Sequence, residues 1–418
     1  MEITAGQLAI LAAKEITKRL FKAPGSTISQ SEIATVVRQT VIGGDGYVIT
    51  APAGSAAADS DEMLLVMRHC TELLARADGL EVTFTVAPDR SRSVSVRRTN
   101  ADVREKVVIR ALDEAGGGLV TAPIAASSLA RGHLELFVLP AGMTLRHRWF
   151  WPDPNWSEWG DMDLPVGRAT AIAAGSKDEY AQEVAVAVGD VVYNRWWTGE
   201  DWGWSHWDVM PRLGTPVIDL AFSSNIADAL EIYALDAEGR IRHRWWRRDR
   251  GWSRDWTPMD TPHGRRVTAI AAGSYADYHQ ELFAIVDGEI WHRWWWRNDG
   301  WSSWRQQAAV GRYAAGIAVS TLKEGHIEVF ALSHAGQLRH RWYWAGHGWS
   351  GWQDFPVPGG SRLIAITAAS NSPRHQEIFG LKSSGEIVHT WNWLHDDGKP
   401  DWDSWSEWST WHQMPPIS

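Results

Sequence analysis

The chain has a single cysteine, Cys70, among 418 residues, and its formal net charge is only −9. One cysteine excludes an intramolecular disulfide and a cysteine-based zinc site, and it suits a reducing compartment. No run of basic residues is present, so nucleic acid and anionic membranes are poor partners by bulk electrostatics. No apolar run approaches the about 20 residues that a membrane-spanning helix needs, so we expect no membrane insertion.

The common signatures of catalysis are also missing. The sequence contains no Gly-x-Ser-x-Gly, no His-Glu-x-x-His and no glycine-rich phosphate-binding loop. Calcium-binding motifs are absent, and the histidines of the repeated triplets described below occur one per repeat, too far apart to share an ion. We therefore predict no enzymatic activity, no cofactor and no metal.

The N-terminus lacks the features of a secretory signal. It carries no basic stretch, and Lys14 interrupts the apolar run Leu8–Ala13, which favours an amphipathic helix over a signal peptide. We expect a cytoplasmic protein, and release, if it occurs, by a non-classical route.

Tryptophan is missing from the first 148 residues, whereas all 29 tryptophans lie at or after Trp149. This step in composition predicts a domain boundary, with a small α/β domain over residues 1–116 and a hinge at Gly116–Gly118. The expected elements are helices over Ala5–Phe21, from Ser29 to about Gln39, from about Asp61 to Ala77 and from Asn100 to Gly116, a strand at Tyr47–Ala51, and a hairpin of Leu80–Val86 with Ser91–Arg97 around a turn at Pro88-Asp89.

The rest of the chain repeats one pattern six times. A fixed period of roughly 40–50 residues filled with short alternating strands is typical of a β-propeller, so we predict a six-bladed, all-β propeller over residues 119–418. The tryptophan that closes each His-Arg-Trp-like triplet recurs every 47 to 49 residues, at Trp149, Trp196, Trp245, Trp294, Trp342 and Trp391.

Each repeat contains four strand-like segments, A to D. Segment A is small and apolar and ends in Ser or Thr, B opens with Glu, C ends in the triplet, and D opens with Trp-Ser. An up-and-down strand order places the A–B and C–D connections at one end of a blade, so Ser, Glu, Arg and Trp should converge there. Segment D is expected to open at Trp156, Trp204, Trp252, Trp301, Trp349 and Trp405.

This set of side chains suits sugar recognition. An indole stacks on the C–H face of a pyranose, a carboxylate accepts hydrogen bonds from hydroxyls, and a guanidinium donates them with fixed geometry. Several weak sites on one ring would give avidity for clustered glycans. The predicted sugar-binding residues are Glu135, Arg148, Trp156, Glu183, Arg195, Trp204, Glu231, Arg244, Trp252, Glu281, Arg293, Trp301, Glu328, Arg341 and Trp349.

A structural role for the same residues stays open, because a Glu–Arg pair with Trp in every blade could simply tie strands together. For the triplet tryptophan we favour packing between blades. The first tryptophan of segment D lies beside a loop and is the better ligand candidate. Blade 2 has Asn194 in place of the triplet His. Blade 6 has Thr390 in place of Arg and a longer C–D loop, so we predict an altered or inactive pocket there and at most five competent sites.

The combination of the segment-B Glu, His-Arg-Trp and Gly-Trp-Ser-x-Trp resembles the Trp-rich β-propeller lectins of the Photorhabdus lectin type and, more distantly, tectonin-like propellers. The resemblance covers about residues 119–418. It implies a lectin for fucosylated or O-methylated glycans, with sites between neighbouring blades. Those lectins have seven blades, and they lack a domain like residues 1–116.

Two functions are therefore expected. The first is a multivalent glycan-binding protein in which residues 1–116 act as an oligomerisation, adaptor or effector module. An oligomerisation module would give a homo-oligomer formed through residues 1–116. The alternative is an intracellular scaffold or sensor whose propeller binds a protein partner. The repeated Glu, Arg and Trp set favours the first function, and the missing signal peptide favours the second.

Overall fold

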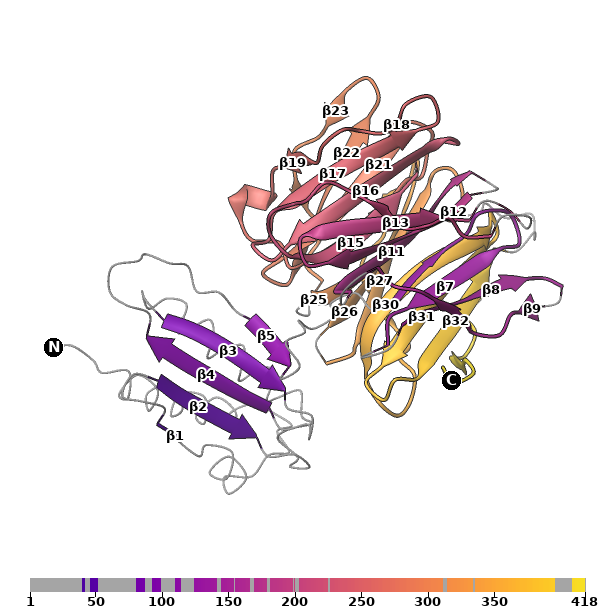
Figure 1. The fold of residues 1–418 in the computed structure, drawn as a ribbon. Coiled ribbons are helices and arrows are strands. Elements are labelled where there is room, and N and C mark those ends of the chain that lie inside the picture. Colours follow the sequence, from indigo (N-terminus) through magenta and orange to yellow (C-terminus); the bar gives the residue numbers. More distant parts are fainter. Residues whose placement is uncertain are drawn as a thin grey trace. The chain divides into compact units, whose positions relative to one another are not determined.

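A computed structural model describes five strands within residues 40–113 and most of residues 124–417 (Figure 1). Within the second range, the description omits residues 141–143, 154, 166–168, 179–180, 198, 200–202, 225, 311–313, 334 and 395–407. The chain divides into two compact units, Met1–Leu119 and Val120–Ser418. No helix among the described residues is long and apolar enough to cross a membrane.

The first unit contains a five-stranded sheet in the order β1-β2-β4-β3-β5. The predicted strand and hairpin are confirmed, because β2 and the antiparallel pair β3–β4 cover those residues. The predicted helix from Asn100 to Gly116 is wrong in its last part, since pairing with β3 in parallel turns that segment into a strand and overrides the local helical pattern. The other predicted helices and the Pro88-Asp89 turn lie outside the described residues. The strands are β1 (Thr40–Val41), β2 (Gly46–Ala51), β3 (Leu80–Val86), β4 (Arg92–Arg98) and β5 (Arg110–Asp113).

The second unit consists of six antiparallel sheets of four or five strands each, which confirms the predicted six-bladed propeller. Blade 1 contains β6 (Ile124–Ser127), β7 (Leu134–Val138), β8 (Leu145–Trp151), β9 (Asn155–Trp156) and β10 (Gly160–Met162); blade 2 contains β11 (Ala171–Asp178), β12 (Ala181–Val188), β13 (Val191–Trp196) and β14 (Asp208–Val209); blade 3 contains β15 (Val217–Ser223), β16 (Ala229–Asp236), β17 (Ile241–Arg247), β18 (Gly251–Trp252) and β19 (Thr257–Met259).

The other three blades repeat this plan. A short 3-10 helix, η1 (Pro262–Gly264), precedes blade 4. Blade 4 contains β20 (Ala269–Gly273), β21 (His279–Val286), β22 (Glu289–Trp296), β23 (Gly300–Trp301) and β24 (Arg305–Gln306); blade 5 contains β25 (Ala314–Ser320), β26 (His326–Ser333), β27 (Leu338–Trp344), β28 (Gly348–Trp349) and β29 (Gln353–Phe355); blade 6 contains β30 (Leu363–Ser372), β31 (His375–Lys382), β32 (Ile387–Trp393) and β33 (His412–Gln413).

The innermost strands close the ring. Each of β6, β11, β15, β20, β25 and β30 contacts the next, and β30 contacts β6, so blades 1 and 6 lie side by side (Figure 1). The Nε1–H of Trp159 in blade 1 donates to the Pro415 carbonyl oxygen at the end of blade 6, 3.0 Å away. Closure of the ring therefore gives each blade a neighbour on both faces, and the short outer strands are the edges that remain.

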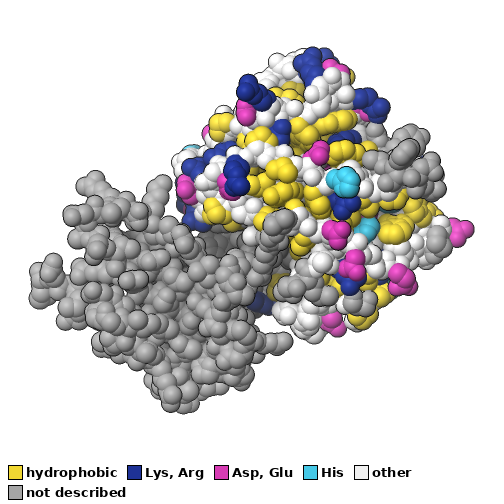
Figure 2. All heavy atoms as spheres, viewed as in Figure 1, with side chains coloured by type: hydrophobic (Ala, Val, Ile, Leu, Met, Phe, Trp, Pro, Cys, Tyr) yellow, Lys and Arg dark blue, Asp and Glu magenta, His cyan; other side chains and the backbone are white. Residues whose placement is uncertain are grey.

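The hydrophobic core lies between the blades as six layers. One layer joins blades 3 and 4 through Tyr233, Leu235, Leu282 and their neighbours, and each of the other five joins another adjacent pair. The innermost strands contain small residues, which let six blades approach one axis. The second strand of each blade is almost fully buried between its neighbours. Hydrophobic side chains also reach the surface of the propeller, between charged ones (Figure 2).

Candidate functional site

The predicted convergence at one end of each blade is present. In blade 4, Glu281 is the cross-strand partner of both Gly273 and Trp294, and the adjacent Trp295 pairs with Trp301. The other blades have the same register, with Glu opposite the triplet tryptophan in the pairs Glu135–Trp149, Glu183–Trp196, Glu231–Trp245, Glu328–Trp342 and Glu377–Trp391.

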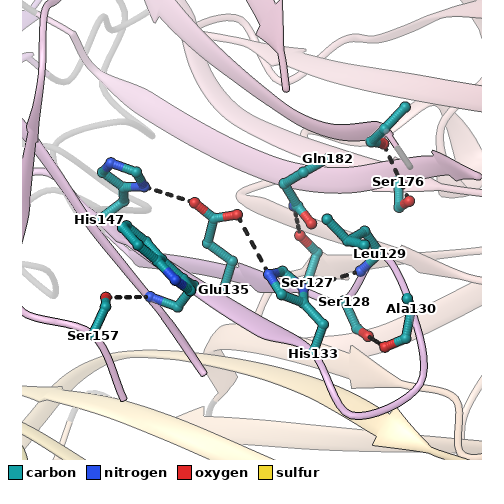
Figure 3. A network of polar contacts seen from close by, with 12 residues as sticks. Ser127, Ser128, Leu129, Ala130, His133, Glu135, His147, Ser157, Ser176 and Gln182 are labelled. Atoms are coloured by element: carbon teal, nitrogen blue, oxygen red, sulfur yellow. Dashed lines mark hydrogen bonds and ion pairs between the residues drawn. The ribbon is translucent and has the colours of Figure 1, made fainter. Parts of the chain in front are cut away.

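The segment-B glutamates are buried, and in four of the six blades they are hydrogen-bonded to histidine. In blade 1, Glu135 lies between His147 and His133, and its Oε2 is 3.9 Å from His133 Nε2 (Figure 3). Four blades share this arrangement, with Oε1–Nδ1 distances of 2.6 Å for Glu135–His147 and 2.5 Å for Glu281–His292, Glu328–His340 and Glu377–His389. Burial raises the pKa of Glu135 and Glu377, while the hydrogen bond from histidine opposes the rise.

A second histidine, two residues before the glutamate, completes the network in these four blades. Each of these rings packs against the tryptophan two residues after the triplet, and burial lowers its pKa to about 4, so it is neutral at pH 7. The ring centroids are 5.0 Å apart in His133–Trp151, 4.7 Å in His279–Trp296 and His326–Trp344, and 4.6 Å in His375–Trp393. Sequence reasoning missed these histidines, although their repeated spacing from Glu was visible.

In blades 2 and 3, the buried glutamate is bonded to residues other than histidine. In blade 2, Asn194 Nδ2 donates to Glu183 Oε1 at 2.6 Å, and Lys177 Nζ lies 2.5 Å from Oε2. In blade 3, the Tyr233 hydroxyl donates to Glu231 Oε2 at 2.6 Å. Every blade therefore supplies a partner for its buried carboxylate, as burial of a charge requires.

Each triplet arginine lies between the two tryptophans of segment D. In blade 1 it also donates to the main-chain oxygen of Ser157 at 2.5 Å (Figure 3). In blade 6, Thr390 takes the place of arginine, and its hydroxyl donates to the corresponding oxygen of Ser409 at 2.7 Å. The distances from the guanidinium carbon to the two ring centroids are 5.4 and 5.3 Å for Arg148, 5.8 and 5.3 Å for Arg195, 5.6 and 5.9 Å for Arg244, 5.2 and 5.4 Å for Arg293, and 5.0 and 5.7 Å for Arg341.

The segment-D tryptophans pack between blades. The first is edge-on to an aromatic ring of the preceding blade in Trp204–Phe137, Trp301–Tyr233, Trp349–Phe283, Trp408–Phe330 and Trp156–Phe379, and Trp252 packs into the layer between blades 2 and 3. The second donates its Nε1–H to a main-chain oxygen of the preceding blade or of the segment that follows it: Trp207 to Asp163, Trp256 to Pro211, Trp304 to Asp260, Trp352 to Ala308 and Trp411 to Pro356.

The predicted start of segment D in blade 6 was wrong. The serine of segment D accepts a hydrogen bond from the main-chain N–H of the triplet tryptophan in every blade, and in blade 6 the serine that does so is Ser409, bonded to Trp391. Segment D of blade 6 therefore opens at Trp408, three residues later than predicted. Trp405 lies outside the described residues, and the longer loop, in which Trp-Ser occurs twice, explains the error.

The triplet tryptophans keep part of their rings in solvent. Trp149 is 39% exposed, and the other five are partly buried. Each ring lies beside the triplet histidine where that residue is present, as in His147–Trp149 with centroids 5.5 Å apart. In blade 1 the structure reverses the two expected roles, because Trp149 is exposed whereas Trp156 packs against blade 6; in the other blades both rings are partly buried, and Trp342 packs between blades 5 and 6 as predicted.

The fifteen predicted residues therefore lie together as repeated sets, but mostly inside the protein. The glutamates are at most 9% exposed, and the segment-D tryptophans are partly buried. Their contact with a sugar stays a prediction. Among the described residues, no group of three His, Cys, Asp or Glu side chains could hold a metal ion.

Comparison with solved structures shows a shared propeller fold. The chain is similar to the BP39L lectin from Burkholderia pseudomallei, with a TM-score of 0.50 and 16% identity over 65% of this chain and 96% of that one. It is similar to AofleA from Arthrobotrys oligospora, with a TM-score of 0.51 and 14% identity over 73% and 94%. The fucose-specific lectin from Aleuria aurantia gives a TM-score of 0.49 and 16% identity over 70% and 96%. No protein-family model and no curated protein matches the sequence.

Proposed function

We propose that the propeller is a lectin that binds fucosylated or O-methylated glycans through its triplet tryptophans. The observation that carries this proposal is the indole of Trp149, which is 39% exposed at the end of blade 1 where the repeated Glu, Arg and Trp residues gather. Keeping aromatic surface in water costs free energy, so an exposed indole at this position indicates a ligand surface rather than a fold requirement. Indole faces stack on the apolar face of sugars.

The buried residues give this surface its rigidity. The main-chain N–H of Trp294 is bonded to Ser302 Oγ at 3.0 Å, and Glu281 and His292 fix the adjacent part of the same strand. Arg293, on the third strand of blade 4, lies between Trp301 and Trp304 and so connects that strand to the outer segment of the blade. We propose that the predicted Glu, Arg and segment-D Trp residues orient the triplet tryptophans, so little conformational entropy is lost when a sugar binds.

The lectin named in the structural comparison supports this proposal at the level of fold, because the BP39L protein is described as a lectin. Fucose or O-methyl-sugar preference comes from the sequence resemblance. Residues 1–116 enter the proposal as an oligomerisation, adaptor or effector module, which would add avidity if it joined several rings.

A glycan array probed with the full-length protein tests the proposal. We expect selective binding, led by fucosylated or O-methylated glycans, and reduced binding by the Trp149→Ala variant with its fold intact by circular dichroism. Binding of no glycan above background would overturn the lectin proposal and would make an intracellular protein partner the function to test next.

A further inference from the structure

The six triplet tryptophans differ in what lies over them. Each points toward the next blade, on the same face of its sheet as the triplet histidine and one residue of the outer strand. In blade 4 that outer residue is Arg305, the cross-strand partner of His292, and its guanidinium lies 4.7 Å from the Trp294 ring centroid. The chain's own arginine therefore covers the indole of blade 4.

Blade 6 is covered in the same way. His412 is the partner of His389 on the outer strand, and its ring stacks on Trp391 with centroids 4.7 Å apart and an interplanar angle of 25°. This is the nearly parallel geometry that a ligand ring would adopt, so His412 occupies the stacking position.

Other side chains occupy the space between the blades. At the junction of blades 2 and 3, Lys177 Nζ lies 4.7 Å from the centroids of both Trp196 and Trp246, and it is paired with the buried Glu183. An ammonium between two indoles and beside a carboxylate fills that site with an internal cation.

The junction of blades 5 and 6 is closed by apolar residues. There Leu322 and Leu394, exposed by 4% and 3%, form a small cluster against which Trp342 packs. Four of the six triplet tryptophans are thus covered by described residues of the chain itself, in four chemically different ways.

Blade 1 is built differently because its outer strand has Gly160 at the position opposite His147. Glycine places no side chain over Trp149, which is the most exposed of the triplet tryptophans at 39%. A Cβ added at Gly160 would lie 2.9 Å from His147 Nε2, so this ring nitrogen faces the space that other blades fill with a side chain.

The histidine adds a polar contact to this open indole. His147 Nδ1 is bonded to the Glu135 carboxylate, which holds the ring in place and leaves Nε2 for a second polar contact. An indole face and a polar ring nitrogen thus lie side by side, with ring centroids 5.5 Å apart. A sugar with an apolar C–H face and an adjacent hydroxyl matches this pair.

We propose that the sites of the propeller are unequal, and that the principal sugar site is at Trp149 and His147 on the side of blade 1 that faces blade 2. In blades 2, 4, 5 and 6 the triplet tryptophan is instead contacted by Lys177, Arg305, the Leu322–Leu394 pair and His412, of which Arg305 and His412 hold the outer-strand position that Gly160 has in blade 1. This inference rests on the proposed lectin function for the identity of the ligand, but the difference in coverage is a property of the fold alone. Blade 3 enters only as an outcome of the test.

Hydroxyl-radical footprinting with mass spectrometry tests the coverage without any sugar. Among the triplet tryptophans of the full-length protein, we expect Trp149 to be oxidised fastest. The Arg305→Gly variant should raise oxidation of Trp294, and Gly160→Arg should lower that of Trp149. Equal oxidation of Trp149, Trp294 and Trp391 in the wild-type protein would overturn the coverage argument, whatever the ligand is.

Calorimetric titration with methyl α-L-fucoside tests the site. We expect Trp149→Ala and Gly160→Arg each to weaken binding about tenfold or more, the loss of roughly one stacking contact. Arg305→Gly should add binding sites per chain. Should Gly160→Arg fail to fold, Trp149→Ala and Arg305→Gly still decide the question.

The outcomes separate the two proposals. If the wild-type protein binds no fucoside while the footprint follows the expected order, the fucoside-binding function fails and the coverage stands. If Trp149→Ala leaves affinity and stoichiometry unchanged in a protein that does bind, the site lies elsewhere and the inference is refuted. Binding that is instead lost on mutation of Trp245 would place the principal site in blade 3 and would equally refute it.

Discussion

The substitution Trp301→Ala distinguishes a structural from a ligand-binding role for the segment-D tryptophans. Trp301 packs edge-on against Tyr233 and His243 of blade 3, with centroids 6.2 and 6.3 Å away, and lies beneath the guanidinium of Arg293 at 5.2 Å. Replacing a large buried aromatic residue by alanine costs roughly 3–5 kcal/mol. Because Trp301 is partly exposed, we expect a loss of about 3 kcal/mol in the free energy of unfolding.

Urea unfolding followed by near-ultraviolet circular dichroism measures this loss. All 29 tryptophans lie at or after Trp149, so the tryptophan signal reports on the propeller and not on residues 1–116. With a denaturant slope of about 3 kcal/mol per molar for a unit of this size, the urea midpoint should fall by about 1 M.

Trp149→Ala is the matched control. Its indole is 39% exposed, so we expect a cost of about 1 kcal/mol, less than half that of Trp301→Ala. An unchanged urea midpoint for Trp301→Ala, or a larger fall for Trp149→Ala, would refute the assignment of the first ring to packing and the second to the ligand surface.

Three further predictions follow from the buried networks. Burial lowers the pKa of His279 and His375 from 6.5 to about 4, so stability is greatest above pH 6.5 and is lost as the pH falls toward 4. The free energy of unfolding measured in urea should decrease by roughly 1–2 kcal/mol per histidine by pH 5, partly offset by the raised pKa of Glu377, and His279→Gln should flatten the pH profile. Arg341→Thr imitates blade 6, and it should cost about 1 kcal/mol in thermal or urea unfolding and less than Arg341→Ala, which leaves the Ser350 oxygen without its donor. Trp159→Phe keeps an aromatic ring but removes the N–H donor that bonds blade 1 to blade 6, and we expect a loss of about 1 kcal/mol; no loss would mean that this bond does not help to close the ring.

The repeat period was enough to predict the propeller and its number of blades. Six copies of one strand pattern bury their apolar faces only by stacking on one another, and a closed ring satisfies all of them. The convergence of Glu, Arg and Trp also followed from the sequence, because an up-and-down strand order fixes which segment ends meet. In the N-terminal unit, the strands of alternating residues were predictable, but β5 was not, since a parallel partner 27 residues earlier stabilises it and nothing local indicates this.

The architecture, the repeated set of side chains and the end of the ring on which they gather could all be predicted from the amino-acid sequence. The structure was needed to show that Trp149 meets solvent while the first tryptophans of segment D pack between blades, because the burial of these rings depends on the neighbouring blade. The structure also shows that four of the glutamates bond to histidine. Lys177, Arg305 and His412 each cover the triplet tryptophan of their own blade, whereas Gly160 leaves that of blade 1 open. The side chains that cover these tryptophans come from strands that are distant in the chain, so no local sequence pattern predicts the contact.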